Sequence, residues 1–142
     1  MKNSESKYCN CLYFNAAALA RKVEKMATES WKETGLAPSH AYLLLLILEE
    51  PGMQPGCIAS HLQLSPSTIT RLIEKLEEKK LVVRTTEGKL TNVYPTPKAK
   101  ELLPQMKNCG QQFYKSCVDV LGKEENSKIV SALRSVADKL GD

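Results

Sequence analysis

Short hydroxyl side chains and a single arginine lie close together in one segment, residues 65–71. The segment reads Ser-Pro-Ser-Thr-Ile-Thr-Arg. Hydroxyl groups of this size can approach phosphates and base edges closely, and a guanidinium one helical turn later can contact a guanine edge or a phosphate. These residue types predict a surface that reads double-stranded DNA, and its candidate contacts are Ser65, Ser67, Thr68, Thr70, Arg71 and, one turn further along, Lys75.

The positive charge of the chain lies in the same region. The 142 residues carry a net charge of +4. Residues 1–64 and residues 101–142 each hold equal numbers of basic and acidic side chains, whereas residues 65–100 hold eight basic and four acidic ones. A basic excess confined to one segment is typical of a surface that binds a polyanion.

No motif points to catalysis, so we expect neither an enzyme nor a cofactor. The chain shows no nucleophile motif, no glycine-rich phosphate loop and no paired carboxylates beside a plausible pocket. The longest apolar run, residues 41–48, is too short to span a bilayer, and the N-terminus lacks the pattern of a signal peptide. Five cysteines, an odd number, argue against a disulfide framework. We therefore expect a cytoplasmic protein with reduced thiols.

The apolar pattern predicts a mainly helical chain with one small β-hairpin. Apolar residues recur at helical spacing in six segments, and β-branched residues mark two short strands around a Glu-Gly-Lys turn. The expected helices are residues 11–34, 38–50, 54–63, 65–81, 97–121 and 129–140, and the expected strands are residues 82–86 and 90–94.

This order of elements is that of a winged helix-turn-helix, in which the second helix of the motif enters the major groove of DNA. Ser65 and Pro66 suit the start of that helix, because serine caps helices and proline fits their first turn. Arg84 and Lys89, at the base and the tip of the hairpin, could reach the minor groove or the backbone. Ser65 could also serve only as a cap, and Lys75 could pair with neighbouring glutamates on its helix. Arg84 could instead form a contact within the protein.

The run from Gln54 to Arg84 resembles the MarR family of bacterial regulators. The resemblance is carried by Ile58-Ala59-x-x-Leu62-x-Leu64-Ser65-x-Ser67-Thr68-Ile69-Thr70-Arg71-x-Ile73-x-Lys75-Leu76-Glu77, followed by Leu81-Val82-x-Arg84. Upstream, Leu36-Ala37-Pro38-Ser39 matches the family too, as does Thr96-Pro97-Lys98-Ala99 after the hairpin. The similarity runs through most of the chain in the same order.

This resemblance implies a homodimer that binds a palindromic operator. Residues 36–96 would form the winged-helix DNA-binding lobe, and residues 8–34 and 97–142 would supply interlocking dimerisation helices. Many family members release DNA when a small anionic or phenolic effector, or an oxidant, acts between the two parts. A polar-aromatic set could line such an effector pocket, although core packing is the favoured role for each member: Tyr13, Trp31, His40 and Tyr42.

One departure concerns the hairpin. The family wing usually carries an Asp-Arg pair near its tip, with the Asp oriented by the arginine at the position of Arg84. Residues 85–94 contain neither Asp nor Arg. Glu87 is the candidate replacement for the aspartate, and Lys89 is the candidate for the cation at the tip.

Two alternatives remain open on the same fold. Peroxide-sensing members carry a reactive cysteine near the first helix, so Cys9 or Cys11 could sense oxidants; a metal site combining these cysteines with His40 or His61 is a weaker variant of this idea. A winged helix can also serve as a protein-interaction module that binds no DNA, but the basic excess in residues 65–100 argues against that reading.

Overall fold

The computed structural model describes residues 1–141; Asp142, the last residue of the predicted dimerisation segment, lies outside them. The chain is mainly helical with one hairpin, as predicted. The elements in chain order are η1 (Asn3–Glu5), α1 (Leu12–Trp31), η2 (Lys32–Thr34), α2 (Pro38–Glu49), α3 (Pro55–Leu62), α4 (Pro66–Glu78), β1 (Val82–Glu87), β2 (Leu90–Pro95), α5 (Pro97–Leu121) and α6 (Lys123–Leu140).

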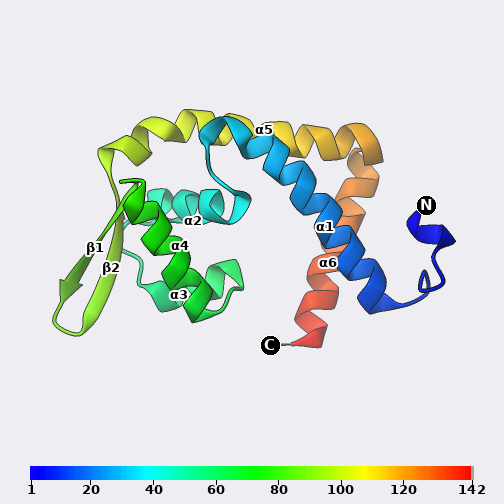
Figure 1. The fold of residues 1–142 in the computed structure, drawn as a ribbon, viewed down its shortest axis with the longest axis horizontal. Helices are drawn as coiled ribbons and strands as arrows, with labels where there is room; N and C mark the ends of the chain where they lie inside the picture. Colours follow the sequence, from blue (N-terminus) through cyan, green and yellow to red (C-terminus); the bar gives the residue numbers. More distant parts are fainter. Residues whose placement is uncertain (142) are drawn as a thin grey trace.

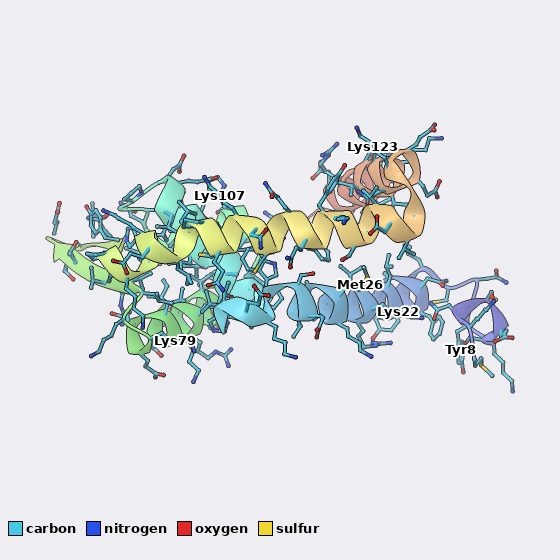
Figure 2. All side chains as sticks on the ribbon, turned by 90° about the horizontal axis from the view of Figure 1, so that it is seen from above. Tyr8, Lys22, Met26, Lys79, Lys107 and Lys123 are labelled. Atoms are coloured by element: carbon cyan, nitrogen blue, oxygen red, sulfur yellow. The ribbon has the colours of Figure 1, made fainter. Side chains whose placement is uncertain are left out.

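The long helix α5 connects two groups of elements (Figure 1). The lobe formed by α2, α3, α4 and the hairpin lies below one end of α5, and α1 and α6 lie below the other. Viewed from above, α1 runs beside α5 (Figure 2). Both termini lie on the side of α1 and α6, away from the hairpin.

The ends of the helices follow local chemistry. Gly35 ends the first helical segment at φ 72°, a left-handed conformation that glycine adopts without strain. The predicted helix over residues 11–34 is divided here, because α1 ends at Trp31 and the last turn is a 3₁₀ helix. Proline occupies the first turn of α2, α3, α4 and α5, where its missing N–H costs no hydrogen bond.

The core lies mainly in the lobe. α2 is apolar on most of its sides, and Ala41, Leu43, Leu44 and Ile47 are all fully buried. Helices α3 and α4 pack against it through Ile58, Ile69, Ile73 and Leu76. Trp31, Met106 and Cys109 extend the same core to α1 and α5. The buried core therefore holds α4 firmly by one face.

The hairpin is an antiparallel pair whose register runs from Val82 opposite Pro95 to Glu87 opposite Leu90. Each strand is longer than predicted, so the turn is a two-residue loop, Gly88-Lys89, with Gly88 at φ 64°. A third short segment joins the sheet, because Met53 forms a β-bridge with Val93. Isolated hairpins are marginally stable, and this bridge ties the wing to the lobe.

The far end of the molecule is much less covered. α5 continues through Pro104 and Gly110 without a break and ends at Gly122. α6 has no buried residue within the described part of the chain. Among residues 1–141, no helix combines the length and apolarity needed to cross a membrane.

Candidate nucleic-acid interface

Helix α4 is strongly amphipathic. Ile69, Leu72, Ile73 and Leu76 are buried in the lobe. The opposite face is exposed and consists of Ser67, Thr70, Arg71, Glu74 and Lys75. α4 lies next to the hairpin, at the end of the molecule opposite the N-terminus (Figure 1). The helix is therefore anchored on one side and accessible on the side that carries the hydroxyls and the guanidinium.

Three hydroxyl groups form a cluster at the start of α4. The Ser65 Oγ accepts a hydrogen bond from the Thr68 backbone N–H at 3.3 Å, so Ser65 caps the helix as predicted. The same oxygen lies 2.9 Å from the Thr68 Oγ1 and 3.3 Å from the Ser67 Oγ. Three hydroxyl protons serve two hydroxyl–hydroxyl contacts, so at least one proton stays available to donate to a phosphate. The capping role of Ser65 therefore leaves the cluster able to bind an anion at a helix N-terminus.

The basic side chains of residues 65–100 differ in the ion pairs and hydrogen bonds that they form within the protein. Lys75 forms an exposed ion pair with Glu78 at 3.7 Å, a contact of little energetic value in water. Lys98 donates a hydrogen bond to the Lys79 carbonyl at 3.0 Å. Within residues 1–141, no carboxylate forms an ion pair with five other basic side chains: Arg71, Lys79, Lys80, Lys89 and Lys100.

Arg84 forms an ion pair within the protein. Its Nη2 lies 2.7 Å from the Glu77 Oε1, and both side chains are about one-third exposed. The carboxylate that pairs with Arg84 therefore comes from the last turn of α4. It does not come from Glu87, the candidate replacement for the aspartate of the family wing. Glu87 pairs with Leu90 at the tip of the hairpin instead. The family motif contains Glu77 but does not predict its pairing with Arg84; its position in the last helical turn before a short loop is the signal for that pair.

The junction between α4 and the hairpin is tightly bonded. Lys80 adopts a left-handed conformation with φ 61°, which turns the chain from the helix into β1. The Thr96 hydroxyl donates to the Lys80 carbonyl at 2.8 Å, and the Thr96 N–H donates to the Leu81 carbonyl at 3.0 Å. Lys98 donates to the carbonyl of Lys79, the C-cap residue of α4. These bonds hold the start of α5 and the base of the wing against the end of α4.

The four residues suggested for an effector pocket do not form one group. The rings of Trp31 and Tyr42 pack with centroids 5.8 Å apart. Trp31 is fully buried, and its Nε1 has no hydrogen-bond partner among the described residues. Burial raises the pKa of the Tyr42 phenol, and proximity to Cys117 raises it further. Tyr42 is therefore a neutral donor beside an indole N–H that lacks an acceptor.

His40 and Tyr13 lie elsewhere. His40 is two residues from Tyr42 on α2, and side chains at that spacing point to different sides of a helix. Burial lowers the pKa of His40, and the nearby Lys79 and Lys75 of α4 lower it further. Tyr13 is 82% exposed on the first turn of α1, about 27 Å along the helix axis from Trp31. Within one chain, only Trp31 and Tyr42 of this set come together.

The N-terminal cysteines are unbonded. Cys11 is exposed at the N-cap of α1, and Cys9 is partly buried. The Asn15 amide donates hydrogen bonds to the carbonyls of both residues, at 2.7 and 2.9 Å, and so fixes the chain that enters the helix. No group of three potential metal-ligating side chains occurs in the part of the chain that the structure describes, so Cys9, Cys11, His40 and His61 form no metal site there.

A family model described as "MarR family" matches residues 34–89, which contain α2, α3, α4, β1 and the turn of the hairpin but not β2. Among curated proteins, the chain is similar to the HTH-type transcriptional repressor MdtR of Bacillus subtilis (strain 168). The two are 28% identical over 72 residues, which is 51% of this chain and 46% of MdtR. The aligned segment thus spans less than half of that relative.

Solved structures of one regulator share the whole fold. CouR of Rhodococcus jostii RHA1, bound to p-coumaroyl-CoA, superposes with a TM-score of 0.83 at 20% identity, over 93% of this chain and 95% of CouR. CouR bound to a 23-mer DNA duplex gives a TM-score of 0.82 at 20% identity, over 93% and 98%. The matched motif and the shared fold agree: residues 34–89 of this chain match the MarR family, and the chain as a whole has the winged helix-turn-helix fold of the solved structures with which it superposes.

Proposed function

We propose that this chain is a sequence-specific DNA-binding regulator that acts as a homodimer on a palindromic operator. The observation that carries the proposal is the anchoring of α4: its apolar face is buried, and its hydroxyl and guanidinium face is exposed. The groups that we assign to DNA contact on α4 are Ser65, Ser67, Thr68, Thr70, Arg71 and Lys75. On the wing, Lys89 lies on the exposed tip and is the cation for the minor groove or the backbone.

Support for the homodimer comes from the uncovered apolar residues of the helices outside the lobe. On α6, four apolar side chains recur on one face and are 42–72% exposed: Val130, Leu133, Val136 and Leu140. On α1, three apolar residues are also at least 40% exposed: Leu12, Leu19 and Val23. Contiguous apolar faces of this kind mark interaction surfaces. A second copy of the chain would cover them and place two α4 helices on one side of a duplex.

A small anionic or phenolic effector is the second partner that we propose. Its support is the buried indole N–H of Trp31, which has no acceptor among the described residues, beside the neutral phenol of Tyr42. An unpaired buried donor costs free energy, and an effector with an oxygen acceptor would remove that cost. CouR, which shares the fold, has been solved with p-coumaroyl-CoA bound.

Selection of bound fragments from a random DNA pool tests the proposal. We expect enriched fragments to contain a palindrome whose half-sites lie about one helical turn, or about 10 base pairs, apart. Binding should weaken steeply with salt, because the protein displaces counterions from phosphates. A pool that shows no enrichment at low salt would overturn the proposal and favour the protein-interaction module.

A further inference from the structure

The hydroxyl proton of Thr70 is committed within the protein. The Thr70 Oγ1 lies 3.1 Å from the backbone carbonyl oxygen of Pro66, one turn earlier on α4. A carbonyl oxygen can only accept, so the Thr70 hydroxyl must donate this bond. The residue is nevertheless exposed on the free face of the helix. What Thr70 offers to a ligand is therefore its methyl group and the two lone pairs of its oxygen, with no proton to donate.

A methyl group on this face has one natural partner in the major groove. Thymine presents its C5-methyl there, and apolar contact with a threonine methyl is a recognised means of reading it. The three-hydroxyl cluster differs from Thr70 in this respect, because at least one of its protons is free. The start of α4 therefore suits phosphates, and Thr70, one turn further along, suits an apolar base edge.

Arg71 follows Thr70 directly, and both side chains are exposed. No carboxylate of residues 1–141 pairs with this guanidinium. An unpaired arginine in the major groove binds guanine bidentately through O6 and N7. Adjacent positions on the helix thus present a methyl group and a guanidinium fork, which complement a thymine and a nearby guanine.

We propose that Thr70 is a specificity-determining residue that recognises a thymine through its methyl group, with this thymine close to the guanine bound by Arg71 in each half-site. The inference rests on the proposed function and adds to it the chemistry of the operator. It also changes the role of Thr70 from the hydroxyl contact that its residue type first suggested.

Deoxyuridine provides an atomic test, because it lacks only the C5-methyl of thymine. Each thymine of the selected operator is replaced singly, and affinity is measured by fluorescence anisotropy with the full-length chain. We expect one thymine in each half-site at which the replacement weakens binding about fourfold, the effect of losing one buried methyl group. Replacement of thymines whose methyl groups contact no protein should leave the affinity nearly unchanged.

Two variants of Thr70 then identify the group that reads this base. Thr70→Ser keeps the hydroxyl and removes the methyl, so the thymine-to-deoxyuridine ratio should fall to about one. Thr70→Val removes the hydroxyl and keeps a γ-methyl, so the ratio should stay near about four. Because the readout is a ratio between two probes, a general loss of affinity in either variant does not affect it. Circular dichroism and thermal melting confirm that both variants fold.

The possible failures are distinct. A random pool without enrichment would contradict the proposed function itself. An enriched palindrome whose thymines all tolerate deoxyuridine would leave the DNA-binding function intact and overturn the inference about Thr70. The inference would also fail if Thr70→Ser kept the fourfold ratio, or if Thr70→Val abolished it, because the hydroxyl would then be the reading group.

Discussion

At the scale of single residues, hydrogen bonds inside the protein decide what each polar side chain can offer to DNA. The hydroxyl of Thr70 is used by Pro66, and the charge of Arg84 is matched by Glu77. Arg71 has no such partner among the described residues and keeps its full set of donors. We therefore place the strongest base contact of α4 at Arg71.

Replacement of Arg71 by alanine should cost about 1–3 kcal/mol of operator binding and should relax specificity at one base pair of each half-site. The reason is the loss of a bidentate contact, which has no substitute nearby. Anisotropy titrations with the selected operator and with point variants of it measure both effects. Arg21→Ala, which removes an exposed arginine of α1 outside the basic segment, is the matched control. Full affinity in Arg71→Ala would contradict the assignment of α4 as the recognition helix.

At the scale of elements, the structure ties the hairpin to α4. The Glu77–Arg84 pair joins the last turn of α4 to β1, and the bonds from Thr96 and Lys98 join the same turn to the start of α5. An antiparallel pair of strands is weak alone. These contacts, with the Met53–Val93 bridge, fix the direction in which Lys89 projects.

The Glu77–Arg84 pair should therefore act on stability and leave the ionic contacts to DNA unchanged. In urea unfolding, Glu77→Ala and Arg84→Ala should each destabilise the chain, with a coupling of about 0.2–1 kcal/mol in the double variant, because the pair is partly exposed. The salt dependence of operator binding should stay unchanged in Arg84→Ala, whereas Lys89→Ala should lower the slope by about one. Equal loss of slope in both variants would show that Arg84 contacts phosphate.

The contact between α2 and α4 also makes stability depend on pH. His40 lies on α2, and its pKa is lowered by burial and by the charges of Lys79 and Lys75. When the pKa of a histidine is lower in the folded state, the unfolded chain takes up the proton first as the pH falls. The stabilisation is complete above the ordinary histidine pKa of about 6.5 and is lost as the pH falls through the lowered folded value.

His40→Gln should consequently reduce the drop in melting temperature between about pH 7.5 and about pH 5. Differential scanning calorimetry at several pH values gives the two curves. His61→Gln, at an exposed position on α3, controls for the loss of a histidine as such. A His40→Gln protein that loses as much stability on acidification as the unmodified chain would rule out this contribution.

At the scale of the whole molecule, α5 holds the lobe of α2, α3, α4 and the hairpin at one end and the less covered helices α1 and α6 at the other (Figure 1). α6 buries nothing within the described chain, although its apolar residues repeat at helical spacing. An amphipathic helix of this kind gains its stability by covering that face. A homodimer would bury it and would fix the separation of the two lobes.

Leu133→Asp should produce a monomer, because it places a charge in the middle of the apolar face of α6, where Leu133 is 52% exposed in the single chain. Sedimentation equilibrium should give half the mass of the unmodified protein, and operator affinity should fall more than about tenfold because one half-site is lost. Ser131→Asp, on the opposite face of the same helix, is the control. A Leu133→Asp protein of unchanged mass would place the dimer interface elsewhere.

The pattern of residues was sufficient to predict the order and type of the main helices and strands. Helix and strand periodicities are local properties, and the caps at Ser65, Gly35 and Gly122 act within a few residues of the chain. The exposed side of α4 was also predictable, because the apolar repeat through Ile69, Leu72 and Leu76 leaves only one face for solvent. The resemblance to the MarR family added the expected partners to this local picture.

Only the tertiary structure showed which groups from different elements come into contact, because the spacing of residues along the sequence does not predict such contacts. The pairing of Arg84 with Glu77, the bridge between Met53 and Val93, and the packing of Trp31 on Tyr42 all depend on how the elements pack in three dimensions. The donor state of Thr70 also required the structure, although Pro66 is only four residues away, since the rotamer of Thr70 directs its hydroxyl to the Pro66 carbonyl.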